Sequence, residues 1–141
     1  MIFILDTNVL SAVMASRPAP LVAAWMAGQP PNLLFTASIC QAEILSGIAV
    51  LPRGRRREGL ETAARGMFLE DFAGRVLPFD TEAAVAYADL FAARRRAGRP
   101  AATADLMIAS IARVKGASVV TRDIGDFEEC GLTLIDPWTA A

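Results

Sequence analysis

Short apolar runs alternate with longer stretches of helical spacing along the 141-residue chain. The apolar runs are continuous rather than alternating, as in strands buried on both faces, and lie at residues 2–5, 33–36, 76–79, 117–121 and 132–135. The helical patterns lie between them, at residues 7–14, 21–27, 39–50, 56–72, 81–97 and 103–115. Strands that alternate with helices predict an α/β fold, with a parallel sheet covered by helices on both sides.

Residues at the ends of these segments refine the prediction. Ser38 and Thr103 stand where the N-caps of two helices are expected, and Gly116 stands where a helix should end. Pro78 favours an edge position for the third strand, because proline cannot donate a hydrogen bond to a neighbouring strand. A chain of this length, without repeats or linkers, predicts a single domain over residues 1–141.

The amino-acid composition limits the kinds of active site that the chain can form. Hydrophobic residues make up 54% of the chain, enough to bury a core, and the net charge of −1 neither favours nor excludes nucleic acid as a ligand. The absence of histidine excludes Ser-His-Asp triads, Cys-His dyads and zinc sites built on imidazole. Cys40 and Cys130 lack a CxxC spacing, so we expect both to be reduced thiols in the core.

The N-terminus predicts a cytoplasmic protein. Asp6 follows the first apolar residues directly, without the basic segment and the longer apolar run of a signal peptide. No uncharged run approaches the ~20 residues that a membrane span requires. We therefore expect no contact with a membrane.

Four carboxylates from distant segments are expected at one edge of the sheet. Asp6 and Asp123 follow the first and fourth strands, and the carboxyl ends of parallel strands share an edge. Glu43 lies in the early turns of the helix that leaves the second strand, so it stays near that edge. Asp105 starts the helix that enters the fourth strand from the opposite end, which puts the N-terminus of this helix at the same edge. Ligands of open α/β sheets bind at such a place.

A cluster of carboxylates favours a bound cation. Two carboxylates ~4 Å apart repel each other by about 4 kcal/mol at an effective dielectric constant near 20, unless a proton or a cation intervenes. Oxygen ligands without imidazole or thiolate suit Mg²⁺ or Mn²⁺. Because such ions orient and acidify water and stabilise developing phosphoryl charge, the cluster favours metal-assisted phosphodiester hydrolysis.

Each carboxylate also has an ordinary structural role open to it. Asp6 suits the N-cap of the helix that follows it, Asp105 complements a helix dipole, and Asp123 suits a turn. For Glu43 the ordinary role is a solvated helix face, which explains its apolar neighbours less well. Gly47, one helical turn further on, clears space on the same face.

The segments that carry these acids resemble the four motifs of PIN-domain ribonucleases. They are Leu5-Asp6-Thr7-Asn8-Val9-Leu10-Ser11, Glu43 with Gly47, Asp105-Leu106-Met107-Ile108-Ala109, and Thr121-Arg122-Asp123-Ile124-Gly125-Asp126-Phe127. Their order and spacing match along nearly the whole chain, and the size is that of the VapC and FitB toxins of bacterial toxin–antitoxin pairs. The resemblance implies a three-layer α/β/α domain with a central, mainly parallel twisted sheet.

The same resemblance implies an endoribonuclease that depends on Mg²⁺ or Mn²⁺ and hydrolyses RNA with metal-activated water. The catalytic, metal-binding acids that it implies are Asp6, Glu43, Asp105 and Asp123, with hydrogen-bonding support from Asn8 and Thr121. Asp126 offers a second carboxylate after the same strand. We favour Asp123 as the fourth acid because it is nearer the strand end, and expect Asp126 to support it.

A VapB-type antitoxin and a homodimer are also implied by the resemblance, which places the antitoxin's C-terminal segment in an apolar groove beside the metal site. Candidates for that groove are more apolar side chains than one small sheet needs: Leu21, Trp25, Met26, Leu51, Leu60 and Met67. Core packing is their ordinary explanation, and an exposed subset would suit a partner helix.

RNA requires cations outside an acidic site, and arginine suits phosphate well. Thirteen of the 14 basic residues are arginines. Two clusters are the RNA-binding candidates: Arg53, Arg55, Arg56 and Arg57, and then Arg94, Arg95, Arg96 and Arg99. The second cluster ends a helix, where cations also complement the helix dipole, but its position just upstream of Asp105 favours RNA.

Two alternatives differ in chemistry. Aspartyl-phosphate phosphotransferases of the haloacid dehalogenase type also place an Asp after a buried first strand. They require a second Asp where Asn8 stands and a suitably placed lysine, whereas Lys115 is the only lysine. A catalytically silent PIN-like module that binds RNA or protein would keep the scaffold without the activity, and the presence of all four acids argues against it.

Overall fold

The computed structural model describes residues 1–139, with five strands in one sheet. The strand order is β3-β2-β1-β4-β5, and each neighbouring pair is parallel. The strands are β1 Phe3–Leu5, β2 Leu34–Ala37, β3 Val76–Leu77, β4 Ser118–Val120 and β5 Leu134–Ile135. All five strands predicted from the apolar runs are present, and β3 lies at an edge, as Pro78 predicts.

Helices connect these strands. The α-helices are α1 Thr7–Met14, α2 Pro20–Ala27, α3 Ser38–Ala49, α4 Arg55–Gly66, α5 Thr81–Arg96 and α6 Thr103–Lys115. Shorter helical segments are η1 Pro31–Leu33, η2 Met67–Asp71 and η3 Ile124–Phe127. Within residues 1–139, none of the helices combines the length and the hydropathy of a membrane span.

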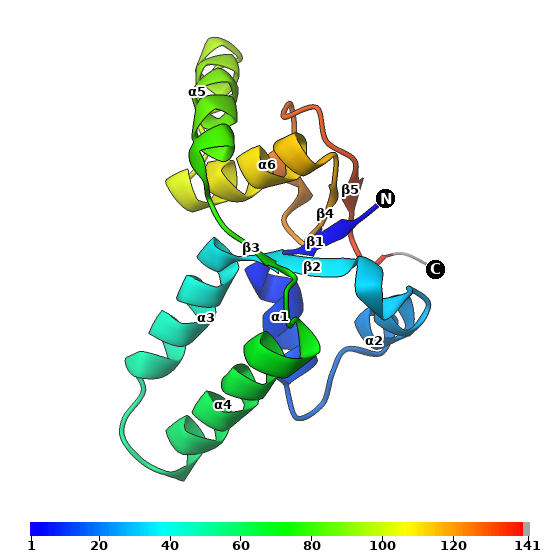
Figure 1. The fold of residues 1–141 in the computed structure, drawn as a ribbon, viewed down its shortest axis with the longest axis vertical. Coiled ribbons are helices and arrows are strands. Elements are labelled where there is room, and N and C mark those ends of the chain that lie inside the picture. The colour runs from blue at the N-terminus through cyan, green and yellow to red at the C-terminus, as the bar shows by residue number, and fades with distance from the viewer. Residues whose placement is uncertain (140–141) are drawn as a thin grey trace.

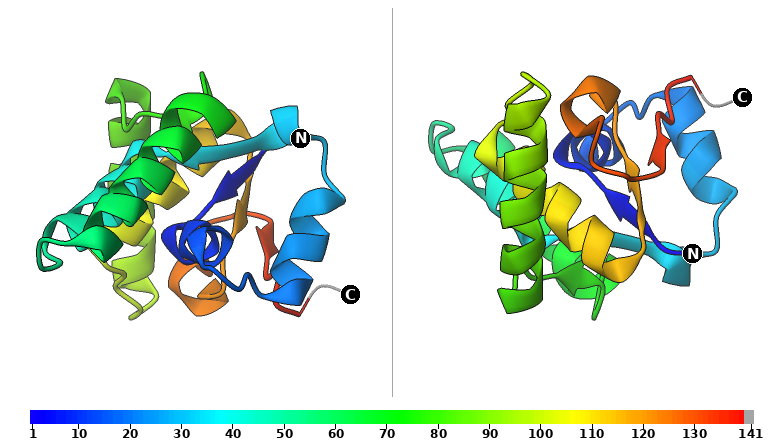
Figure 2. Two further views of the ribbon diagram at one scale, coloured as in Figure 1. Left: turned by 90° about the horizontal axis from the view of Figure 1, so that it is seen from below. Right: turned by 90° about the horizontal axis from the view of Figure 1, so that it is seen from above.

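The direction of the connections sorts the helices into two layers. The steps from β1 to β2 and from β2 to β3 run the same way across the sheet, and the step from β3 to β4 crosses back. Because such crossovers are right-handed, the helices of the first two steps and those of the third cover opposite faces. Figure 1 shows α5 and α6 above the strands and α1, α3 and α4 below them, and Figure 2 shows these two layers from below and from above. The three-layer α/β/α architecture is confirmed.

The core lies around β1, β4 and α6. Ile4, Leu5, Val119 and Val120 are fully buried, which explains why the apolar runs of these two strands are continuous. α6 contributes a further row of buried residues to the same core. The strand order reverses between β1 and β4, so the carboxyl ends of these two strands border the crevice where open α/β sheets bind ligands.

Two local expectations are wrong, and two are confirmed. Ser38 and Thr103 are the first residues of α3 and α6 rather than their caps, because the preceding alanines hold the extended conformation and no side chain caps either helix. The helix expected over 56–72 is present as α4, which continues directly into the π-helical segment η2. Gly116 ends α6 with a φ of 62°, as expected of a helix-terminating glycine.

The π-helical segment has a reason in packing. Its wide turn is closed by the Phe72 N–H, which donates to the Met67 carbonyl oxygen at 2.9 Å. Met67, Phe68 and Phe72 are all buried. A π-turn holds more residues than an α-turn, so these three side chains share a narrower arc of the helix surface and reach the core together.

Candidate active site

Asp6 stands where β1 ends, in the crevice at which the strand order reverses. Its backbone N–H donates to the Val120 carbonyl oxygen of β4 at 2.9 Å. One carboxylate oxygen, Oδ1, accepts from the Thr7 N–H at 2.8 Å, so Asp6 also fills the capping role open to it. The other, Oδ2, accepts from the Thr121 hydroxyl at 2.8 Å. The residue is only 5% exposed.

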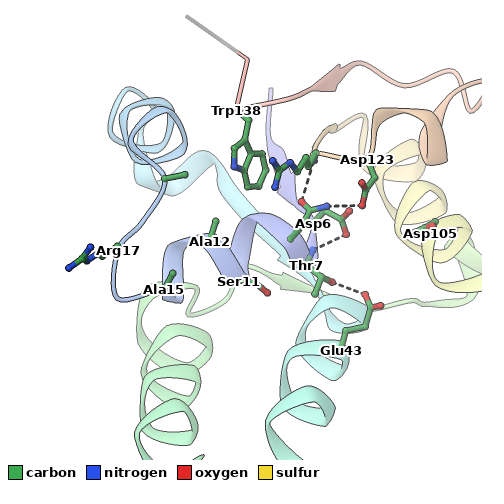
Figure 3. Close-up of a pocket in the computed structure, with 13 residues that line it drawn as sticks. Asp6, Thr7, Ser11, Ala12, Ala15, Arg17, Glu43, Asp105, Asp123 and Trp138 are labelled. Atoms are coloured by element: carbon green, nitrogen blue, oxygen red, sulfur yellow. Dashed lines mark hydrogen bonds between the residues drawn. The ribbon is translucent and has the colours of Figure 1, made fainter. Parts of the chain in front are cut away.

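Asn8 ties this acid to the loop that follows β4. Its side-chain amide donates to Thr121 Oγ1 at 3.3 Å and to Asp123 Oδ2 at 3.0 Å, and its Oδ1 accepts from the Arg122 N–H at 3.2 Å. The Asp123 N–H donates to Thr121 Oγ1 at 3.0 Å. One hydrogen-bonded network therefore joins the ends of β1 and β4 and fixes two of the four acids (Figure 3).

Glu43 and Asp105 approach from the helices. The Glu43 side chain is exposed, and its Oε1 accepts from the Thr7 hydroxyl at 2.7 Å. Asp105 lies half-buried in the first turn of α6. Burial, followed by the negative charge of Asp126, raises the pKa of Asp105 to about 6. Asp6, Glu43 and Asp123 raise this pKa as well, so four other carboxylates act on Asp105.

The pKa of Asp6 is also raised. Burial is the main cause, and the hydrogen bonds from Thr121 and Thr7 oppose it. The nearby charges of Glu43 and Asp123 add to the rise. Within residues 1–139, no arginine or lysine forms an ion pair with any of these acids. The repulsion among them is therefore not relieved by a direct ion pair within the described residues.

The acids share one cavity of about 640 Å³. Its lining includes the four acids predicted from the sequence: Asp6, Glu43, Asp105 and Asp123. Figure 3 shows Glu43 and Asp123 on either side of Asp6, with Asp105 set back on α6. Asp126 lies outside the residues that line the cavity, although its charge reaches Asp105. The distant segments thus converge as expected.

The acids fit a hard divalent cation in their chemistry but not in their present spacing. The donors are carboxylate oxygens, which suit Mg²⁺ or Mn²⁺. Within the described part of the chain, however, no three acidic or thiol groups stand close enough together to hold an ion. Two of the acids are drawn toward their own donors, Glu43 toward Thr7 and Asp123 toward Asn8. Both side chains are exposed and free of core packing.

The arginine candidates divide into free and engaged side chains. The assignment of Arg94 to RNA binding is corrected. Its side chain is only 4% exposed, and its guanidinium donates to the Arg99 and Glu128 carbonyl oxygens. Its guanidinium therefore binds backbone carbonyl groups within the fold and does not reach a phosphate. Arg99 is exposed but pairs with Glu128 at 3.0 Å and Glu129 at 3.5 Å. These contacts fasten the loop after η3 to the end of α5.

The remaining arginines are more accessible. Arg57 forms an ion pair with Glu61 at 2.8 Å, and five candidates are exposed: Arg53, Arg55, Arg56, Arg95 and Arg96. Figure 1 places the loop between α3 and α4 at one end of the molecule's long axis and α5 at the other. The two clusters therefore do not form one continuous basic surface.

A second cavity, of about 360 Å³, continues from the acidic one between α1, α3 and α4. The two cavities share Thr7, Ser11, Ala15 and Glu43. The second is otherwise mainly apolar, and its lining includes Leu51 and Leu60 from the predicted apolar set. The other members of that set differ in burial: Met67 is buried, Trp25 and Met26 are half-buried, and Leu21 is exposed.

Sequence reasoning missed part of the acidic cavity. Arg17, Arg122 and Trp138 line it, together with small side chains of α1 and the segment after it. Arg122 lies inside a motif already singled out, and its position between two hydrogen-bonding residues was the available signal. Trp138 gave none, because it follows the last strand, in a segment with no periodic pattern.

The model of the PIN domain family matches residues 3–131. The chain belongs to the PIN-domain family. Plasmid stability protein StbB of Pseudomonas syringae pv. tomato is 42% identical to this PIN domain over 137 residues, which are 97% of this chain and 99% of StbB. VapC ribonuclease Y4jK of Sinorhizobium fredii is 41% identical over 138 residues, with 98% and 99% covered.

Solved structures support the same assignment. A chain of FitAB bound to an IR36 DNA fragment matches this PIN domain with a TM-score of 0.93 at 32% identity, covering 99% of this chain and 98% of that one. The resemblance to VapC and FitB proteins that the motifs predict is confirmed by these matches.

Proposed function

We propose that this PIN domain is the endoribonuclease toxin of a toxin–antitoxin pair. The observation that carries the proposal is the convergence of four acids from β1, α3, α6 and the end of β4 on one cavity at the switch point of the sheet. A family relative that is named a VapC ribonuclease supports it. RNA lies in the cytoplasm, so we place the protein there.

The acids Asp6, Glu43, Asp105 and Asp123 would hold Mg²⁺ or Mn²⁺. When bound, such an ion lowers the pKa of water and stabilises the charge that develops on a phosphate under attack. The protein's own groups prepare this arrangement. Thr121 and Asn8 fix the positions of Asp6 and Asp123, and Thr7 holds Glu43 at the cavity mouth. Asp126 adds negative charge beside Asp105.

RNA contacts come from arginines that are free to reach phosphate. The proposed set is Arg53, Arg55, Arg56, Arg95 and Arg96, and it leaves out Arg57, which pairs with Glu61. It excludes Arg94, which is buried, and Arg99, which is already paired with two glutamates. If these arginines bind single-stranded RNA, replacing any one of them with alanine should reduce the slope of log affinity against log salt by about 0.7.

The apolar groove between α1, α3 and α4 is the place that we propose for the antitoxin. It opens directly into the acidic cavity, since the two share Glu43 and three other residues. A segment lying in the groove would therefore reach the acids and block them. The homologous FitAB structure, a complex of this fold with a second protein and DNA, supports a protein partner of this kind.

We also propose a homodimer. Large apolar side chains remain exposed on α5 and beside the α3–α4 pair: Leu45, Leu69, Val85 and Phe91. A second copy that packs on these residues would remove their apolar surface from water, which favours association. Sedimentation velocity would detect the dimer, and Leu69→Glu, at a residue that is 67% exposed, should favour the monomer if the surface beside the α3–α4 pair is the interface.

The decisive experiment is cleavage of RNA by purified protein in Mg²⁺, in Mn²⁺ and in EDTA. We expect products with either ion and none in EDTA. Asp105→Asn should abolish cleavage and leave the circular dichroism spectrum unchanged, because the amide keeps the shape and loses the charge. Asp6→Asn should do the same, because asparagine keeps the side-chain oxygen that caps α1. Binding of RNA without cleavage in either ion would instead favour the catalytically silent module.

A further inference from the structure

The acidic cavity has a second half that the acids do not occupy. Across from Glu43 it is lined by Trp138, and Figure 3 shows this indole on the far side of Asp6. Arg122 and Arg17 are the two cations in the lining of this cavity. An aromatic ring and a cation beside phosphodiester-cleaving acids are features that the hydrolysis itself does not require.

Trp138 and Arg122 are already arranged as a pair. The Arg122 guanidinium lies over the Trp138 ring, 4.9 Å from its centre. The backbone of each residue is fixed, because the Arg122 N–H donates to Asn8 Oδ1 and the Trp138 N–H donates to Asp136 Oδ1. The pair is thus tied to the network that holds the acids. Both side chains line the cavity, where Arg122 is exposed and Trp138 is half-buried, with part of its indole packed against the core.

Apart from Arg17, the residues of α1 and of the segment before α2 that line the cavity have small side chains. Ser11, Ala12, Ala15 and Ala19 line the cavity from α1 and the segment before α2. None of them extends beyond one or two heavy atoms from Cα, so the space beside the indole stays open. The cavity volume of about 640 Å³ lies in the range of small-molecule sites and leaves room for a nucleotide.

We propose that Trp138 stacks on an unpaired base of the RNA and that Arg122 contacts a phosphate next to that base. The inference rests on the proposed nuclease function and adds a subsite to it. Aromatic rings accept any base because every base has a flat π-face, and arginine matches phosphate with its fork of N–H groups. The acids repel phosphate, so a cation at the cavity wall is needed to hold the backbone beside them.

This subsite selects single-stranded RNA. A base can reach the indole only when it is unstacked and turned away from its neighbours, as in loops and single strands. A base in a duplex stays stacked and cannot enter. Unpaired RNA should therefore bind more tightly than the same sequence in a duplex, and a hairpin should be cut in its loop.

Binding is best measured without cleavage, in EDTA, on a single-stranded RNA of about 12 nucleotides. Trp25→Phe leaves Trp138 as the only tryptophan, since the chain has two. Trp25 packs against Phe3, with ring centres 5.2 Å apart, so this replacement lies outside the cavity. We expect RNA to quench the remaining fluorescence in proportion to binding measured by anisotropy.

Variants of the pair test the interaction itself. Trp138→Leu should weaken binding roughly 5- to 150-fold, the range that corresponds to loss of one stacked base. Trp138→Phe should retain most of the affinity. An RNA with abasic sites should bind the wild type and Trp138→Leu equally, because it has no base to stack. Arg122→Ala should reduce the salt slope by about 0.7, the value for one phosphate of a single strand.

A second arginine–aromatic pair supplies the matched control. Arg95 lies over the Phe91 ring, 5.6 Å from its centre, on the exposed face of α5 and outside the cavity. Phe91→Leu should leave the ratio of the affinities for RNA and for abasic RNA at its wild-type value, because it removes no base contact in the cavity. Thermal unfolding of each variant confirms that the fold is intact before binding is compared.

The outcomes separate this inference from the nuclease proposal. Equal binding of RNA by wild type and Trp138→Leu overturns the stacking, and so does an equal loss for RNA and abasic RNA, even if RNA is still cleaved with Mg²⁺. Failure of the wild type to bind single-stranded RNA overturns it as well. Quenching and base-dependent binding without any cleavage in Mg²⁺ or Mn²⁺ would uphold the subsite and reject the nuclease.

Discussion

The Thr121 hydroxyl donates a 2.8 Å hydrogen bond to Asp6, joining the end of β4 to the end of β1. The same hydroxyl oxygen accepts from the Asp123 N–H and the Asn8 amide. Since Asp6 is almost fully buried, this bond is one of the few contacts that stabilise its charged form. Thr121 therefore favours the ionised form of Asp6 and has no catalytic role of its own in this proposal.

Thr121→Val should test this control, because valine keeps the shape and removes the hydroxyl. The pKa of Asp6, already raised by burial, should rise further once the opposing hydrogen bond is removed. The acidic limb of the RNA cleavage profile should then move to higher pH. The free energy of unfolding should fall by about 1–3 kcal/mol, the range for a buried group that loses its partner. Thr121→Ser keeps the hydroxyl and should resemble the wild type in both measurements.

The raised pKa of Asp105 predicts that the free energy of unfolding of the metal-free protein depends on pH. Its pKa is about 6 in the folded state and 3.8 ordinarily, so between these values the folded protein holds a proton that the unfolded chain has lost. Folding therefore weakens as pH rises through this window, and the loss is complete above it. In EDTA, Asp105→Asn should raise the melting temperature above about pH 7 and reduce the difference between about pH 5 and pH 7. An identical pH dependence in variant and wild type would contradict this assignment.

Arg94 should matter for folding rather than for RNA. Its Nε donates to the Arg99 carbonyl oxygen at 2.6 Å, and its Nη1 donates to the Glu128 carbonyl oxygen. Arg94→Ala removes two hydrogen bonds made by a buried charged group, at about 1.5–3 kcal/mol for each, and should lower the midpoint of urea unfolding. Arg95→Ala, on the exposed face of the same helix turn, is the matched control. It should leave the midpoint unchanged and reduce the salt dependence of RNA binding. The reverse pattern would restore Arg94 to the RNA surface.

The sequence predicted the positions of the acids better than their final geometry. Asp6 and Asp123 could be placed because apolar runs mark the strands and the ends of parallel strands share an edge. The spacing of Glu43 and Asp105 depends on side-chain rotamers and on partners such as Thr7, which no periodic pattern encodes. Arg94 was misassigned for a related reason. A cation in a last helical turn looks exposed until a distant loop covers it.

Trp138 shows the other limit. Nothing in its local sequence marks it, because a residue after the last strand is placed by the path of the whole chain. Its meeting with Arg122 spans two loops that only the folded sheet brings together. Residues at the ends of strands were therefore predictable, whereas contacts between two distant loops were not.

Substitutions at Gly47 should change antitoxin binding without destabilising the fold. It lies inside α3, where glycine costs about 0.5–1 kcal/mol relative to alanine, and a Cβ built there meets nothing within 4 Å. Packing therefore does not require this glycine, but it lines the groove proposed for the antitoxin. Gly47→Ala should raise the melting temperature slightly. Gly47→Trp should fill the groove, retain RNA cleavage and escape neutralisation by a co-expressed antitoxin in a growth assay. If antitoxin still protects cells from Gly47→Trp as it does from the wild type, its segment does not lie between α1, α3 and α4.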